Sequence, residues 1–282
     1  MTAGALLFGA IVLSGGAASA RSGTDPCAEA ESALASAAEA LDKGQWARAD
    51  YQSALALSLS PDCPEALVIQ GRILSQRGQA HAARQALEKA ASLDPENAEA
   101  RYHLGVWLYR RQLHPEAVPH LEKVVALRPM DARAYDYLAL SLEALGNAER
   151  AALAYRSALK VNDGPFSDPF LEYYYGRFLL KQNRLEESRS HLDRAVALHP
   201  RERTAHYERA KLYLALREYG AARRDAERAL SLRDPGGLVL DLQVYYLLAT
   251  VYGRLGETEL ARKYAELART TEIPDQAGDR RR

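Results

Sequence analysis

The chain has 282 residues, and its 37 basic and 37 acidic side chains leave no formal net charge at pH 7. Binding to nucleic acid normally requires a basic excess or a basic stripe, so we expect no nucleic-acid partner. The sequence contains no Gly-rich phosphate loop, no G-x-S-x-G, no C-x-x-C and no H-E-x-x-H. Its seven histidines are scattered, mostly at polar helix positions, which favours solvated side chains over metal ligands. We therefore expect a protein that is not an enzyme and carries no cofactor and no metal.

Residues 1–20 have the composition of a signal peptide. The segment 3–13, AGALLFGAIVL, is apolar throughout; it is too short to span a bilayer but suits a signal-peptide core. The tripeptide A-S-A that ends at Ala20 fits a cleavage site, although no Lys or Arg precedes the core. The alternative is a buried helix or an uncleaved anchor. We expect cleavage after Ala20, a polar linker over residues 21–29, and a periplasmic or secreted protein that meets a membrane only through export or a partner complex.

Residues 64–95 show the pattern of two short amphipathic helices joined by a turn at Gly78. Small or apolar residues recur every three or four positions in both halves, which places them on one face of each helix. These positions are Leu67, Gly71 and Leu74 in the first half, and Ala83, Leu87 and Ala90 in the second. Neither helix could bury such a stripe alone, so each pair must pack against another.

The same pattern recurs every 34 residues along most of the chain. The copies span about 30–63, 64–97, 98–131, 132–165, 169–202, 203–236 and 242–270. Turn-forming insertions interrupt the period near 162–169 and 234–241. We expect residues 30–270 to form one elongated array with a core along its length, followed by a disordered tail over 271–282.

This recurring pattern resembles the tetratricopeptide repeat (TPR), a helix–turn–helix unit of 34 residues. Leu104-Gly105 and Pro129 in the third copy, and Tyr155 in the fourth, match its signature positions. The resemblance implies an all-α, right-handed α-solenoid of about seven helix pairs. It also implies a non-catalytic scaffold that binds another protein in a concave groove.

In the TPR family, the groove is lined by a recurring set of positions on the first helix of each repeat. In this sequence those positions are rich in tyrosine and basic residues. The candidate groove residues are Arg72, Tyr102, Tyr109, Arg110, Tyr173, Arg177, Lys181, Tyr207, Lys211, Tyr246 and Arg254. Tyrosine offers a large amphipathic contact and arginine binds carboxylates through two hydrogen bonds, so the surface suits an extended peptide that is acidic or ends in a carboxylate. The alternative is that the tyrosines fill gaps between helices and the cations are solvated.

We predict a scaffold that binds a peptide segment or partner protein in this groove, in cell-envelope assembly. The alternative function is a scaffold for exopolysaccharide export, in which groove tyrosines stack on sugars. The sequence leaves the identity of the partner and the oligomeric state open.

Export would place Cys27 and Cys63 in an oxidising compartment, where disulfides form. Each precedes the first helix of a repeat, and the starts of those neighbouring helices lie side by side in a stacked array. A disulfide needs Cα atoms within about 7 Å, whereas packed helices usually lie about 8–10 Å apart. A disulfide and two unpaired cysteines therefore both remain open.

Overall fold

The computed structural model describes residues 25–164, 166–234 and 237–271, which contain α-helices, one 3-10 helix and no strand. In chain order the elements are η1 (Ala28–Ala30), α1 (Glu31–Asp42), α2 (Trp46–Leu59), α3 (Pro64–Gln76), α4 (Ala80–Leu93), α5 (Ala98–Arg110), α6 (His114–Leu127), α7 (Ala132–Ala144), α8 (Ala148–Lys160), α9 (Leu171–Lys181), α10 (Leu185–Leu198), α11 (Arg203–Ala215), α12 (Tyr219–Ser231), α13 (Asp241–Leu255) and α14 (Thr258–Thr270). Within these described residues, no helix is long and apolar enough to cross a membrane. The predicted signal peptide over 1–20 lies outside the described residues, as does all but the first residue of the predicted tail.

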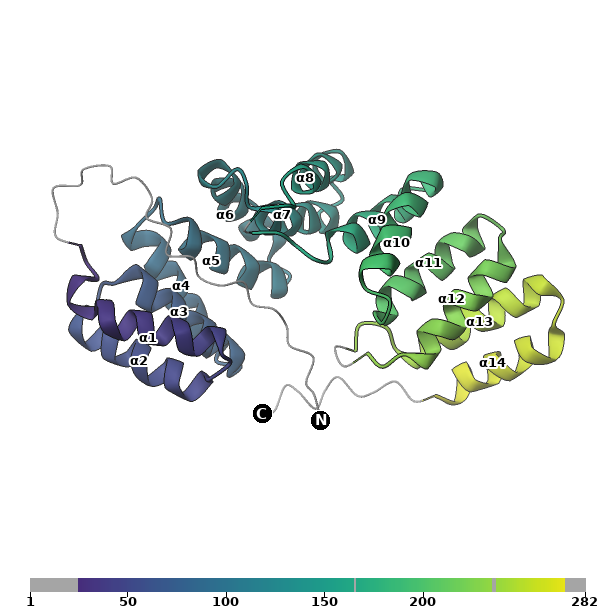
Figure 1. Ribbon diagram of the computed structural model, residues 1–282, viewed down its shortest axis with the longest axis horizontal. Helices are drawn as coiled ribbons and strands as arrows, with labels where there is room; N and C mark the ends of the chain where they lie inside the picture. Colours follow the sequence, from purple (N-terminus) through teal and green to yellow (C-terminus); the bar gives the residue numbers. More distant parts are fainter. Residues whose placement is uncertain (1–24, 165, 235–236, 272–282) are drawn as a thin grey trace. The chain divides into compact units, whose positions relative to one another are not determined.

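Successive helices form antiparallel pairs, α1 with α2 through α13 with α14, and each pair packs on the next within its unit (Figure 1). This arrangement confirms the predicted all-α array of helix–turn–helix repeats. Each of the seven pairs turns at one residue with a left-handed backbone. That residue is Gly44, Gly78, Gly146 or Gly256 in four pairs, and Gln112, Asn183 or Arg217 in the other three. Because residues with a Cβ adopt the same positive φ as the glycines, the turn geometry is set by the packing of the helices and not by glycine alone.

In the second, third and fifth pairs, a glycine of the first helix faces a leucine of the second at close range. A Cβ built on Gly71 would lie 2.7 Å from Leu87 Cγ, and one on Gly176 would lie 2.8 Å from Leu192 Cγ. Both leucines are buried, with at most 1% of their surface exposed. The glycine at this position of the first helix therefore has a steric cause: the leucine of the second helix occupies the space that a side chain on the glycine would need.

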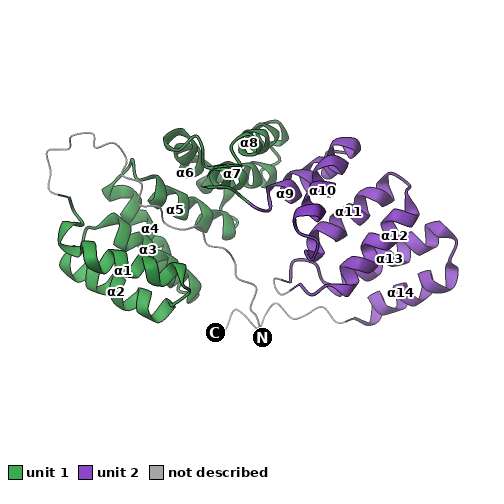
Figure 2. Cartoon of the chain, viewed as in Figure 1, with its two compact units in different colours: residues 1–168 green, residues 169–282 purple. Residues whose placement is uncertain are grey.

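The chain divides into two compact units at residues 168 and 169, so the first unit contains the described residues from 25 to 168 and the second those from 169 to 271 (Figure 2). The sequence favoured one array over 30–270, and the division falls at the insertion that interrupts the period after the fourth copy. In this insertion Asn162 closes a loop, because its Nδ2 donates to the Asp168 carbonyl at 3.1 Å and its Oδ1 accepts from the Asp168 N–H at 2.6 Å. The ring of Phe166 lies under the guanidinium of Arg133, 4.6 Å from its centroid, so the loop folds back on the first unit.

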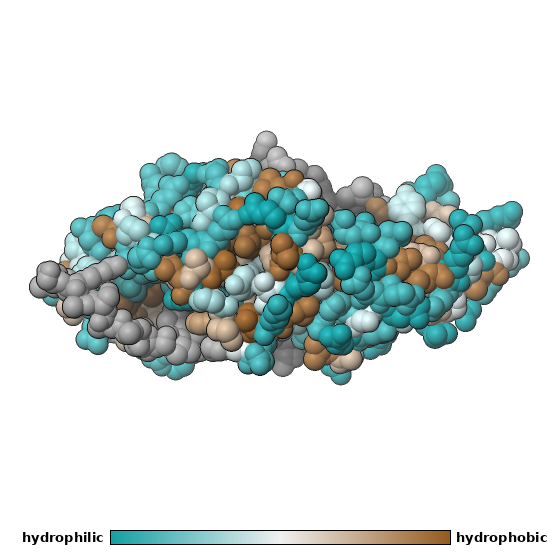
Figure 3. Space-filling view, turned by 90° about the horizontal axis from the view of Figure 1, so that it is seen from above, coloured by the Kyte–Doolittle hydropathy of each residue, from teal (hydrophilic) through white to brown (hydrophobic). Residues whose placement is uncertain are grey.

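The outer surface is largely hydrophilic, as expected when the apolar stripes are buried between helices. On the face drawn in Figure 3, apolar side chains occur in separate groups among hydrophilic ones. The second helices contribute mainly alanine and leucine to the interior; Ala83, Leu87 and Ala90 of α4 are examples with at most 1% exposure.

The glycine–leucine contact predicts opposite effects of the same substitution at two glycines of the second unit. Gly176→Ala should lower the free energy of unfolding by about 1–3 kcal/mol, because the added methyl group must displace Leu192. Gly253→Ala, in the interior of α13 with no atom within 4 Å of the new Cβ, should raise it by about 0.5–1 kcal/mol. Urea unfolding followed by circular dichroism checks both, and a loss of equal size in the two variants would contradict the steric explanation.

Candidate functional site

The predicted groove residues all lie on the first helices of the pairs, or at the ends of those helices. Arg72, Tyr102, Tyr109 and Arg110 belong to the first unit, on α3 and α5. The remaining seven belong to the second unit, on α9, α11 and α13. The structure therefore presents two separate sets, and each is described by itself.

In the first unit, Tyr102 is an interior residue rather than an exposed one. Only 8% of its surface is exposed. Its ring meets Tyr137 edge-on at 6.1 Å and lies under the guanidinium of Arg133, 4.8 Å from the ring centroid. Burial raises the pKa of the Tyr102 hydroxyl well above its ordinary value. Tyr109 also meets Tyr137, at 5.4 Å, so both tyrosines pack against their neighbours.

Glu99, a carboxylate near the predicted groove residues of the first unit, contacts two basic side chains. Glu99 accepts from Arg128 Nη1 at 2.7 Å and lies 2.9 Å from His103 Nε2. Burial alone would raise the pKa of Glu99, but His103 and Arg128 outweigh it and hold that pKa well below its usual range. Burial lowers the pKa of the nearby Arg72 guanidinium, partly opposed by the attraction of Glu99. Arg110, by contrast, is exposed at the end of α5.

In the second unit, Tyr173 is buried as well, with 9% of its surface exposed. Burial raises its pKa to about 12. The guanidinium of Arg177 lies 5.7 Å from the ring centroids of both Tyr173 and Tyr174. Lys181 is exposed at the last residue of α9. Tyr102 and Tyr173 therefore fill gaps between helices, which is the alternative that the sequence left open for the groove tyrosines.

The next two helices in this set leave more aromatic surface accessible. Tyr207 on α11 is half-buried, and Lys211 Nζ lies 5.4 Å from its ring centroid and 2.7 Å from Glu208 Oε2. Tyr246 on α13 is 58% exposed, far more than Tyr102 or Tyr173. Aromatic contact surface is thus available on α11 and α13.

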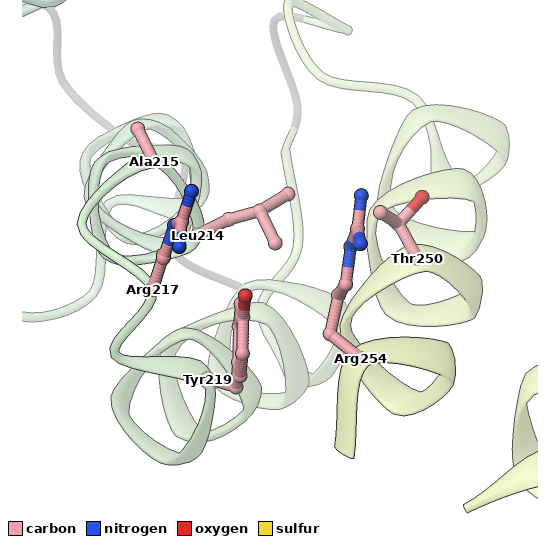
Figure 4. A pocket seen from close by; sticks show the side chains of 6 residues that line it. All are labelled: Leu214, Ala215, Arg217, Tyr219, Thr250 and Arg254. Carbon is pink, nitrogen blue, oxygen red and sulfur yellow. The ribbon is translucent and has the colours of Figure 1, made fainter. Parts of the chain in front are cut away.

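A cleft lies between the end of α11, the start of α12 and the second half of α13. Its volume is about 340 Å³, and its lining residues are Leu214, Ala215, Arg217, Tyr219, Thr250 and Arg254. Leu214 projects between the side chains of Arg217 and Arg254, and the Tyr219 hydroxyl points into the same space (Figure 4). The sequence predicted Arg254 alone from this group. The sequence could have indicated Arg217, because it occupies the turn position that is glycine in four other pairs.

Three histidines are paired with carboxylates, so their interpretation as solvated side chains was wrong. His206 is 6% exposed; its Nδ1 lies 3.0 Å from Asp225 Oδ1 and its Nε2 lies 3.2 Å from the Pro200 carbonyl. Arg209 donates to both oxygens of Asp225, at 2.6 and 2.9 Å. The two others are His103 with Glu99 and His191 with Glu172.

Cys27 and Cys63 form a disulfide that joins the first two helix pairs. Their Cα atoms lie 4.8 Å apart, closer than packed helices usually allow, because Cys27 stands before η1 and not on a helix. The predicted linker over 21–29 therefore ends in an ordered 3-10 turn with a buried cysteine. Glu65 Oε2 lies 2.9 Å from Cys27 Sγ. Although these three residues could form a metal-ligand set, sulfur atoms bonded to each other cannot act as thiolate ligands.

Comparison with known proteins identifies the family. Models of the tetratricopeptide repeat match residues 70–129, 108–168, 176–237 and 242–268. The chain belongs to the TPR family. TPR proteins are scaffolds for protein–protein interaction and are generally non-catalytic. No curated protein matches the chain.

Solved TPR structures share this fold at low sequence identity. PilF of Pseudomonas aeruginosa has a TM-score of 0.63 and 20% identity, over 73% of this chain and 90% of its own. A TPR protein from Parabacteroides merdae has a TM-score of 0.63 and 17% identity, over 89% of this chain and 96% of its own. PilW, described as a widely conserved type IV pilus biogenesis factor, has a TM-score of 0.65 and 17% identity, over 73% of this chain and 93% of its own. Likeness at these identities establishes the fold alone.

The disulfide predicts a strong dependence of the first unit on oxidation. Replacing both cysteines by alanine should lower the free energy of unfolding by about 3–4 kcal/mol on the chain-entropy model, since the bridge closes a loop of 36 residues. Thermal melting of the oxidised protein, the reduced protein and the Cys27→Ala/Cys63→Ala variant checks this. The reductant should leave the variant unchanged, and equal melting of the oxidised and reduced wild type would contradict the prediction.

The Asp225 contacts predict a loss of stability in acid. Burial alone would raise the pKa of Asp225, but hydrogen bonds from His206 and Arg209 lower it below its ordinary value. A carboxyl with a depressed folded-state pKa stabilises the fold above its unfolded pKa of about 3.9, and this contribution disappears as the pH falls through the folded pKa. Asp225→Asn should therefore melt below wild type at pH 7, and the difference should shrink below about pH 4. Glu259→Gln, at an exposed residue of α14, is the control that should change little at either pH.

Proposed function

We propose that this TPR protein is an exported scaffold that binds an extended peptide segment of a partner protein along α11 and α13. The observation that carries the proposal is the contrast among its groove residues. Tyr102 and Tyr173 are buried, whereas Tyr246 is 58% exposed and Arg254 borders an open cleft. Contact surface for a partner therefore concentrates on the last two repeats.

The spacing of residues on α13 supports a linear ligand. Tyr246, Thr250 and Arg254 are four residues apart and share one face of the helix. On the neighbouring helix α11, Tyr207 and Lys211 have the same spacing and lead towards Leu214. An extended peptide between these two rows would meet tyrosine rings at one end and arginine at the other, and Tyr supplies a large contact area with few rotatable bonds.

A role in cell-envelope assembly rests on three supporting observations. Residues 1–20 have the composition of a signal peptide. The Cys27–Cys63 disulfide is of the kind that forms in oxidising compartments such as the periplasm. The fold resembles that of PilW, described as a type IV pilus biogenesis factor. Together they favour a periplasmic or secreted location.

The alternative, a scaffold for exopolysaccharide export, has less support. Stacking on sugars needs a row of exposed aromatic faces, whereas Tyr102 and Tyr173 are buried and only Tyr246 among the predicted groove tyrosines is largely exposed. Peptide binding, in contrast, uses the polar and apolar surfaces of α11 and α13 together. We therefore favour a protein partner.

Tyr246→Ala tests the proposed surface. The variant should retain the melting temperature of wild type, because the side chain is largely exposed, and should weaken capture of the partner about tenfold. Tyr51→Ala is a matched control: Tyr51 is 68% exposed but lies on α2 in the first unit.

The measurement is affinity capture from envelope extract by the immobilised protein, quantified by mass spectrometry, with a glycan array in parallel. Proteins lost with Tyr246→Ala but kept with Tyr51→Ala support the proposal. Equal capture by both variants, or binding to the glycan array alone, argues against it.

A further inference from the structure

We propose that the cleft between α11, α12 and α13 binds a carboxylate of an acidic segment in the partner polypeptide, held between Arg217 and Arg254. This inference rests on the proposed function, because it specifies the chemistry of the peptide that the scaffold binds. It assigns a site at the turn end of the sixth and seventh repeats, beyond the row of tyrosines.

Both guanidinium groups are unpaired. Among the described residues, neither Arg217 nor Arg254 has an ion pair or a side-chain hydrogen bond. The acidic residues closest to them in sequence are already engaged: Glu218 pairs with Arg189, and Glu257 pairs with Arg223 at 3.2 Å. The cleft therefore carries two uncompensated positive charges.

Two other cations on or near the candidate surface are, in contrast, already paired with carboxylates. Lys211 is neutralised by Glu208 at 2.7 Å, and in the first unit Arg128 is neutralised by Glu99 at the same distance. An anionic group entering the cleft would meet free donors, whereas one approaching Lys211 or Arg128 would have to displace an internal carboxylate.

Arg217 also occupies a backbone position that does not favour it. Its φ is 61°, in the left-handed region, and the equivalent turn residue is Gly44, Gly78, Gly146 or Gly256 in four other pairs. Glycine adopts this conformation without steric penalty, whereas a residue with a Cβ does not. Gln112 and Asn183 hold the same position in two other pairs, so the turn accepts a residue with a Cβ, and the Arg217 side chain borders the cleft.

The remaining lining residues fit a carboxylate on a polypeptide. Arginine presents a planar fork of N–H donors that matches a carboxylate, and the Tyr219 hydroxyl supplies a further donor. Leu214 and Ala215 give an apolar wall for the methylene groups beside the charge. Thr250 and Tyr246 continue from Arg254 along the same face of α13, so flanking residues of the ligand would lie over an exposed aromatic ring.

The test uses fluorescence anisotropy with the full chain and a short labelled peptide of alternating leucine and glutamate, blocked at both ends. The same peptide with glutamine in place of glutamate is the neutral probe. We expect wild type to bind the acidic probe at least tenfold more tightly than the neutral one. Arg217→Gly and Arg254→Gln should each weaken binding of the acidic probe about tenfold.

Arg217→Gly separates binding from folding. Because glycine suits the left-handed turn, this variant should melt at or above the wild-type temperature while losing affinity. Gln112→Gly is its matched control, because Gln112 holds the same turn position in the first unit with a φ of 60°; it should keep wild-type affinity.

Three results would overturn the inference. The first is equal affinity of wild type for the acidic and neutral probes. The second is unchanged affinity for the acidic probe in Arg217→Gly and Arg254→Gln. The third is that inorganic phosphate binds as tightly as the acidic probe and displaces it, which would indicate a site for any anion. If Arg217→Gly and Arg254→Gln still capture the envelope partner like wild type, the scaffold function stands and the carboxylate site is wrong. If wild type captures nothing, the scaffold function itself fails.

Discussion

In the second, third and fifth helix pairs, the close approach of a glycine on the first helix to a leucine on the second sets how near the two helices can lie. With no Cβ on Gly71 or Gly176, the leucine that faces each of them fills the space between the helices. The helices of a pair can then lie near enough to bury their alanine-rich stripes, and stacked pairs can share a core. The turns do not depend on glycine alone, since Gln112, Asn183 and Arg217 adopt the same left-handed conformation as the four turn glycines.

A second constraint governs where charged residues can lie: a buried ionic group needs a partner of opposite charge. Glu99, Glu172 and Asp225 each contact a histidine and an arginine, so these three carboxylates are paired within the protein. At the cleft, by contrast, Arg217 and Arg254 have no ion pair among the described residues. Some charged residues therefore stabilise the fold through internal ion pairs, whereas others remain available to a ligand. Both kinds occupy similar positions along the first helices.

The sequence was sufficient to predict the helices, their pairing and their turns, because these depend on local spacing. It was not sufficient to predict exposure. Tyr102 and Tyr246 occupy equivalent positions in their repeats, but Tyr102 is covered by Arg133 from the next pair, whereas Tyr246 lies on the last pair and is exposed. His206 can be buried because its Nδ1 lies within hydrogen-bond distance of Asp225 on the following helix. Such contacts depend on which residue a neighbouring repeat offers, and the 34-residue pattern does not specify that. The division at Asp168 likewise follows from how one insertion folds.

The disulfide has a consequence for the end of the array. In a stack of repeats, each inner pair is held by two neighbours and a terminal pair by one, so fraying starts at the ends. The Cys27–Cys63 bond ties the start of the first pair to the start of the second. Opening of α1 and α2 then leaves both ends of that segment attached to the second pair, which limits how far the chain can peel away. Because proteases cleave chain that has opened, this covalent tether should lower the susceptibility of the first pair to proteolysis.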